Sequence, residues 1–129
     1  MTSLTAALHF EGNMLPAKAV SIFIHELLRI TGIPEKNLAQ GVGIAEAQLN
    51  RMASRKIGTV RTPTVVSLKR IATVVDEARK TLSPAGVKHW LSTPNPYLND
   101  VAPILCLRSD KEMDKVVALL SAIRHGFPA

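Results

Sequence analysis

The sequence predicts an all-α fold. Apolar residues recur at spacings of three and four along most of the chain, which is the period of an amphipathic helix. No segment alternates apolar and polar residues for long enough to predict a strand. With 47% hydrophobic and 20% charged residues, the chain has the composition of a folded globular protein and not of a disordered one.

The first half of the chain predicts an arm and three helices. Residues 1–14 lack sustained periodicity, and we expect them to form a loose N-terminal arm. A helix is expected over 15–31, where Gly32 stops it. Pro34 opens a second helix that ends at Gly41-Val42-Gly43, and a third helix is expected over 45–55.

The second half predicts a long helix and a series of shorter ones. A loop marked by Gly58 and Pro63 precedes a helix over 64–82. Ser83 and Pro84 have the residue types of an N-cap and a first helical position, so they start a helix over 84–92. Two prolines then interrupt the pattern before a short helix at 101–108. Ser109 and Glu112 form a capping-box pattern that opens a last helix, which ends at Gly126. The apolar stripe of this last helix is Met113, Val116, Val117, Leu120 and Ile123.

Positive charge is concentrated in one short window. The net charge is +6, and residues 51–70 hold six basic residues and no acidic one. Residues 1–50 hold three basic and four acidic residues, and residues 71–129 hold seven and six. A cluster of positive charge is typical of a phosphate-binding surface, although a charge run is often only a solvated face.

The pattern from Leu38 to Met52 predicts a helix-turn-helix unit. A small Ala39 lets two helices cross closely, and Gly43 suits the turn because it adopts positive φ easily. This pattern resembles the DNA-binding domain of the Xre/Cro-repressor type, which places its second helix in the major groove. The resemblance assigns DNA contacts to Glu46, Ala47, Gln48, Asn50, Arg51 and Lys56.

Three residues depart from that resemblance. Ala45 stands where a Ser or Thr cap is usual, Arg55 stands where a Gly often ends the helix, and Glu35 stands where a neutral phosphate donor is expected. The departures leave open a weak DNA-binding domain, or one that is kept only as a scaffold.

The last third of the chain carries the most specific pattern. The run Trp90-Leu91, then Pro94, Asn95 and Leu98, followed by Pro103 and a terminal helix before Gly126, resembles the Xre/MbcA/ParS toxin-binding domain of bacterial type II antitoxins. Trp90 and Leu91 are expected in the core, and Asn95 is expected to hold the turn by side-chain hydrogen bonds.

The resemblance implies a partner and a mechanism. Antitoxins of this family pair with RES-domain toxins, which consume NAD, and their C-terminal segment covers the toxin active site. In this chain the segment consists of Arg124, His125, Gly126, Phe127, Pro128 and Ala129. Operator DNA and a second copy of the chain, as a homodimer, are the other expected partners.

Enzymatic activity is not expected. The four histidines lie on separate segments without metal-ligand spacing, and His25 falls on the polar side of its helix. The single cysteine, Cys106, sits in an apolar run and is expected to be a buried structural thiol. No cofactor, signal peptide or membrane span is expected, which predicts a cytoplasmic protein.

The sequence therefore predicts a helix-turn-helix bundle with a C-terminal helical toxin-binding module, divided into residues 1–14, 15–82 and 83–129. The function expected is that of an antitoxin that also regulates its own operon. The alternatives are a transcription regulator with a C-terminal dimerisation module and no toxin, and an interaction scaffold whose helix-turn-helix no longer binds DNA.

Overall fold

The N-terminal helices form where the apolar stripes predicted them. The computed structural model describes residues 14–126, with the side chains of Met14 and Thr62 left out. Three helices follow one another, α2 (Ala17–Thr31), α3 (Glu35–Val42) and α4 (Glu46–Ser54). Gly43 ends α3 at φ 87°, and its N–H donates to the carbonyl oxygen of Ala39 at 2.9 Å. The turn expected at this glycine is therefore present.

A small sheet corrects the expectation that the chain has no strand. Strand β1 (Met14–Pro16) pairs antiparallel with β2 (Thr59–Arg61), and Leu15 lies opposite Val60. Each strand has three residues, which is too short for an alternating pattern to be recognised. The predicted loop after α4 is thus partly strand. Of the predicted arm, residues 1–13 lie outside the described residues.

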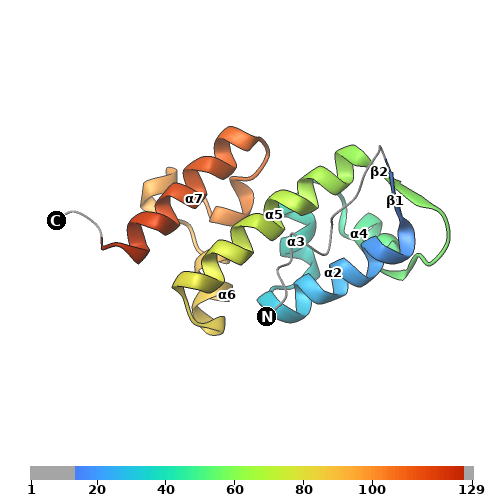
Figure 1. Cartoon of the computed structure of the whole chain (residues 1–129), viewed down its shortest axis with the longest axis horizontal. Coiled ribbons are helices and arrows are strands. Elements are labelled where there is room, and N and C mark those ends of the chain that lie inside the picture. Colours follow the sequence, from blue (N-terminus) through green and yellow to red (C-terminus); the bar gives the residue numbers. More distant parts are fainter. Residues whose placement is uncertain (1–13, 127–129) are drawn as a thin grey trace.

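A long helix links the two ends of the molecule. Helix α5 (Thr62–Thr81) runs from the end that holds α4 and β2 to the end that holds α6 (Pro84–Ser92) and α7 (Asp110–Arg124) (Figure 1). Two single 3₁₀ turns, η1 (Pro96–Leu98) and η2 (Pro103–Leu105), connect α6 to α7. The helix expected over 101–108 is therefore wrong in length, because only the three residues Pro103–Leu105 form a 3₁₀ turn in this segment.

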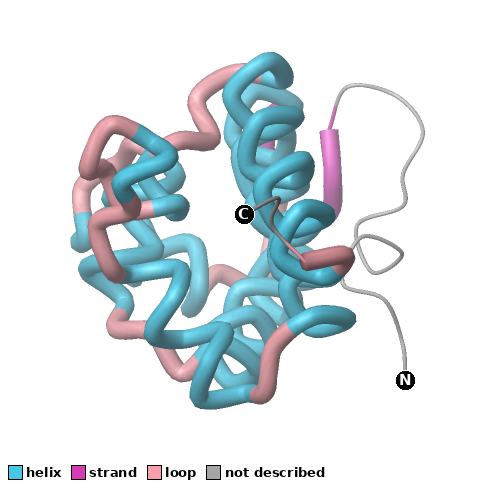
Figure 2. The backbone as a smooth tube through the Cα atoms, turned by 90° about the vertical axis from the view of Figure 1, so that its left-hand side faces the viewer, coloured by secondary structure: helices cyan, strands magenta, loops and turns pink. Residues whose placement is uncertain are grey.

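One hydrophobic cluster joins both halves of the chain. The cluster contains leucines from five helices, each with at most 1% of its surface exposed. They are Leu38 of α3, Leu49 of α4, Leu68 of α5, Leu91 of α6 and Leu120 of α7. Figure 2 shows the helices grouped side by side, with a strand at one edge of the group. The modules expected at 15–82 and 83–129 share this core, so each contributes part of the packing of the other.

Candidate functional site

Helices α3 and α4 cover the residues that the sequence predicts as a helix-turn-helix unit. Leu38, Ala39, Leu49 and Met52 face inward and are buried, as the pattern required. The C-terminal end of α4 is held by α2, where the Ser21 hydroxyl donates to the carbonyl oxygen of Ala53. The Nε2 atom of His25 also lies 2.9 Å from this carbonyl oxygen. His25 is thus exposed, as expected, but it also fixes the position of α4.

The predicted DNA-reading residues lie on α4 and just after its end, and all of them are exposed. They are Glu46, Ala47, Gln48, Asn50, Arg51 and Lys56. Helix α4 starts at Ala45 without a side-chain cap, as the residue type indicated. Asn50 donates weakly to the carboxylate of Glu35, at 3.4 Å between Nδ2 and Oε2. The N-terminal end of α3 therefore presents an acidic group, not a phosphate donor.

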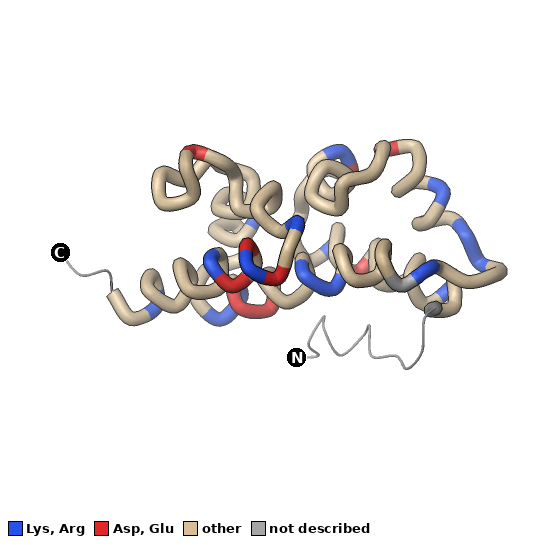
Figure 3. Tube along the Cα trace, turned by 90° about the horizontal axis from the view of Figure 1, so that it is seen from above, with Lys and Arg blue, Asp and Glu red and all other residues tan. Residues whose placement is uncertain are grey.

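Most of the basic window stays available to a partner. Arg51, Arg55, Lys56 and Arg61 are exposed. Arg70 is different, because its guanidinium pairs with Asp110 at 2.9 Å and only 19% of its side chain is exposed. Figure 3 shows mainly Lys and Arg toward the end of the molecule that holds α4 and β2, whereas most acidic residues lie nearer its middle. The charge surplus predicted from the sequence is thus a property of one end of the fold.

The C-terminal module contains a tight turn built on Asn95, which follows α6. Its Oδ1 atom accepts from the N–H of Tyr97 at 2.9 Å, and its backbone pairs with Val101. Asn99 and Asp100 follow in the left-handed region, at φ 57° and 61°. The predicted role of Asn95 in the turn is therefore confirmed, while Pro94 before it is exposed.

The motif residues differ in how deeply they are buried. Leu91 and Pro103 are buried, whereas Trp90 and Leu98 are partly buried and pack against the core. The Leu91 side chain is fully buried, whereas part of the Trp90 side chain stays exposed. The expectation that Trp90 lies in the core needs correction, because Leu91 is the deeper anchor. The Trp90 indole N–H is buried and has no hydrogen-bond partner among the described residues.

The C-terminal module packs closely on α3. Arg108 donates through Nη2 to the carbonyl oxygen of Gln40 at 2.9 Å, near the helix-turn-helix turn. A Cβ atom on Gly41 would lie 2.7 Å from Cγ1 of Ile104, so only a glycine fits at this contact. A sequence pattern does not reveal these contacts, because their partners are more than sixty residues apart.

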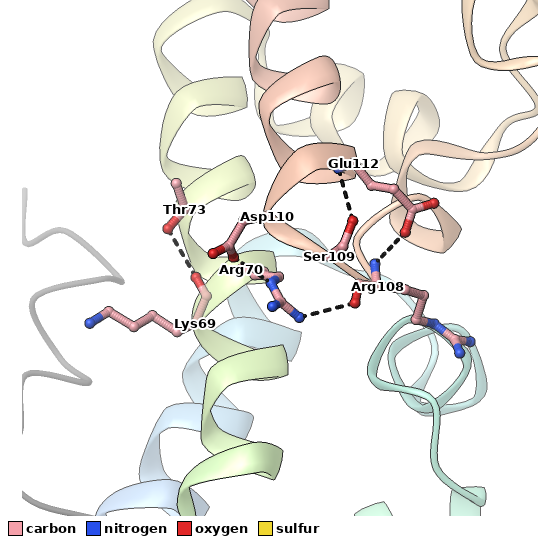
Figure 4. A network of polar contacts seen from close by, with 7 residues as sticks. All are labelled: Lys69, Arg70, Thr73, Arg108, Ser109, Asp110 and Glu112. Atoms are coloured by element: carbon pink, nitrogen blue, oxygen red, sulfur yellow. Dashed lines mark hydrogen bonds and ion pairs between the residues drawn. The ribbon is translucent and has the colours of Figure 1, made fainter.

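A polar network fixes the start of α7 against α5. Arg70 donates to the Asp110 carboxylate at 2.9 Å and to the carbonyl oxygen of Arg108 at 3.3 Å (Figure 4). The Ser109 hydroxyl accepts from the N–H of Glu112 at 3.1 Å, which confirms the predicted cap. The Glu112 carboxylate in turn accepts from the Arg108 N–H at 2.9 Å. Helix α7 is thereby tied both to α5 and, through Arg108, to α3.

Helix α7 ends in an exposed segment at the far end of the molecule. Val116 and Leu120 of the predicted stripe are buried, and Leu119, which the pattern missed, is buried as well. Arg124, His125 and Gly126 are exposed, and an Nη2 atom of Arg124 lies 3.9 Å from the Glu77 carboxylate. Phe127, Pro128 and Ala129 lie outside the described residues. The exposed end of α7 is opposite the end that holds α4 (Figure 1).

Cys106 is partly buried at the end of η2. Burial, together with the charge of Glu112, raises the pKa of the Cys106 thiol above its usual value. A raised pKa keeps the thiol neutral and unreactive, in agreement with a structural role. Among residues 14–126, no group of three or more His, Cys, Asp or Glu could hold a metal ion. In that same part of the chain, no helix is both long and apolar enough to cross a membrane.

The comparisons with known proteins agree with this arrangement. Residues 81–126 match the model of the antitoxin Xre/MbcA/ParS C-terminal toxin-binding domain. A chain in the crystal structure of the M. tuberculosis MbcT–MbcA toxin–antitoxin complex has the same fold, with a TM-score of 0.67 and 20% sequence identity over 84% of this chain and 96% of that one. No curated protein matches the chain. The resemblance inferred from Trp90 to Gly126 is thus confirmed, because residues 81–126 match the C-terminal toxin-binding domain of the Xre/MbcA/ParS antitoxins.

Proposed function

We propose that the chain is an antitoxin that neutralises a RES-domain, NAD-consuming toxin by direct binding. In this proposal the C-terminal module docks on the toxin, and residues 124–129 cover its active site. The chain contributes no catalytic group and needs no cofactor. As a homodimer, it also binds the operator DNA of its own operon through α4 and so regulates its own synthesis.

The observation that carries this proposal is the separation of two exposed surfaces. The end of α7 with Arg124, His125 and Gly126 lies at one end of the molecule, and α4 lies at the other (Figure 1). A partner at one end therefore leaves the other end open. The toxin-binding family of residues 81–126 supports assignment of the toxin to the α7 end.

Charge supports the same assignment. Residues 71–129 carry a net charge of +1, whereas residues 51–70 carry +6. The polyanionic backbone of DNA is attracted to the second region and not to the first. The chain end from Arg124 is basic and partly apolar, so it can pair with acidic residues of a toxin pocket.

Co-purification from the native operon tests the proposal. The tagged chain is expected to retain the small protein encoded beside it, and the pair is expected to lack NAD-consuming activity until the antitoxin is removed. If the chain purifies without a toxin but binds its promoter, it is a transcription regulator with a C-terminal dimerisation module. If it retains a toxin and binds no DNA, the helix-turn-helix serves as a scaffold.

The DNA contact of α4 is tested by Arg51→Ala. Because the exposed Arg51 is assigned to a base edge, its loss is expected to weaken binding to the chain's own promoter by about 1–3 kcal/mol. Fluorescence anisotropy with a labelled promoter duplex measures this change. Lys115→Ala removes an exposed positive charge from α7 and is the control. Equal binding by Arg51→Ala and the wild-type chain would show that α4 does not read the operator.

Dimerisation is tested by sedimentation. Repressors of this type bind two half-sites about one helical turn apart, so a dimer is expected at micromolar concentrations of the chain. Sedimentation equilibrium with and without the promoter duplex measures the mass. A monomer in both conditions would contradict the proposed homodimer.

A further inference from the structure

The loop after α4 exposes a large apolar side chain among basic ones. Ile57 is 87% exposed, the highest value among the exposed large hydrophobic residues of the described chain. Arg55 and Lys56 precede it directly and are also exposed. We call residues 55–58 the basic loop. The exposed isoleucine contributes no burial energy to the fold. A partner that covers it would remove its apolar surface from water, which favours binding.

The fold holds the basic loop in one shape. The Arg55 side chain bends over the loop, and its Nε donates to the carbonyl oxygen of Ile57 at 3.0 Å. Gly58 adopts φ 96°, and a Cβ atom there would lie 2.6 Å from an Nη2 atom of Arg55. The carbonyl oxygen of Gly58 accepts from the N–H of Ala17 at 2.9 Å, which ties the loop to the start of α2.

The small sheet supports the same loop from its other side. Strand β2 follows the loop directly and pairs with β1, and Val60 is buried there. The loop therefore does not have to become ordered when a partner binds, which lowers the entropic cost of binding.

Charge identifies the partner as a polyanion. From Arg51 to Val75 the chain has no acidic residue, and Arg61 adds a further exposed positive charge beside the loop. The first turns of α3 and α4 carry the carboxylates of Glu35 and Glu46. The phosphates of a DNA backbone are therefore attracted more strongly to the basic loop than to the first turns of these two helices.

We propose that the basic loop is a second, preformed DNA contact beside α4. In this contact Arg55 and Lys56 bind phosphates, and Ile57 packs into the adjoining minor groove as an apolar wedge. Isoleucine is one of the side chains that minor-groove proteins insert in this way. The contact compensates for the lost Ser or Thr cap at Ala45 and for the acidic Glu35. The proposal rests on the proposed DNA binding of α4 and assigns a specific role to the loop that follows it.

Two substitutions separate the apolar contact from the charged one. Ile57→Ala is expected to weaken binding to the promoter duplex about tenfold, because apolar area is lost from the interface. It removes no charge, so the slope of log affinity against log salt is expected to stay unchanged. Lys56→Ala is expected to weaken binding to promoter and shuffled duplexes alike and to reduce the magnitude of that slope by about 0.9.

Matched controls exist elsewhere on the surface. Ile22 is 60% exposed on α2, so Ile22→Ala removes the same side chain away from the loop. Lys115→Ala removes an equivalent charge from α7. Both variants are expected to bind DNA as the wild-type chain does. All four side chains are exposed, and thermal melting is expected to show unchanged folding.

Each contrary result has a distinct meaning. If Ile57→Ala binds like the wild-type chain while Arg51→Ala does not, the loop proposal is wrong and DNA binding by α4 stands. If Ile57→Ala leaves DNA affinity intact but weakens the dimer in sedimentation, Ile57 belongs to a protein interface, and the loop proposal is also wrong. If the wild-type chain binds neither duplex at low salt, both the DNA-binding function and the loop proposal fail.

Discussion

Removal of residues 124–129 is expected to abolish protection against the toxin while the chain stays folded. The buried residues of the α7 stripe, Val116 and Leu120, lie before the deletion and keep their packing. The deletion breaks the Arg124–Glu77 ion pair at 3.9 Å, and an exposed pair of this kind contributes only about 0–1 kcal/mol. The deletion therefore removes the proposed active-site cover and leaves the docking surface intact.

Three measurements on the truncated chain distinguish docking from blocking. Thermal melting is expected to match that of the full chain, and co-purification is expected to retain the toxin. Growth and cellular NAD in cells that express the toxin are expected to fall to the level seen without antitoxin. The full-length double variant Arg124→Ala and His125→Ala is the control for length, and it is expected to keep part of the protection. If the truncated chain protects as well as the full one, the blocking residues lie elsewhere.

Gly41→Val is expected to separate the C-terminal module from the helix-turn-helix. A Cβ atom at this position would lie 2.7 Å from Cγ1 and 3.0 Å from the carbonyl oxygen of Ile104. The carbonyl belongs to the backbone, so η2 itself must move. Overpacking of this kind typically costs about 1–3 kcal/mol, and a branched side chain is expected at the upper end of that range. The same movement would displace Arg108, which caps α3 at Gln40.

Chemical denaturation of Gly41→Val measures the loss of unfolding free energy. Gln40→Val is the matched control, because it adds the same branched residue to α3 at an exposed position. That variant is expected to change stability by only about 0.5 kcal/mol. Ile104→Ala is expected to rescue Gly41→Val in part, since it removes the nearest side-chain atom. If Gly41→Val is no less stable than Gln40→Val, the two modules do not depend on this contact.

The sequence alone determined the local structure of this chain. Helical spacing of apolar residues predicted the helices within a few residues of their ends, because each stripe reflects which face of one helix is buried. Ser109 and Asn95 were also predictable, since their side chains bond to backbone only two or three residues away. The toxin-binding family was recognisable for the same reason, as its motif is a run of neighbouring residues from Trp90 to Pro103.

The tertiary structure alone decided what depends on distant pairs. The strands β1 and β2 exist because residues 14–16 and 59–61 meet, and neither segment predicts a strand by itself. Arg70 lies inside the basic window, yet Asp110, forty positions along the chain, pairs with it and removes it from the surplus of positive charge. Leu91, and not Trp90, became the deep anchor because the docking of α6 on the core buries Leu91 fully and leaves part of Trp90 exposed. A sequence pattern indicates which face of each helix is apolar. It does not indicate which face packs on which, and that packing decides the pairing of charges, the close contact at Gly41 and the surface that remains exposed to a partner.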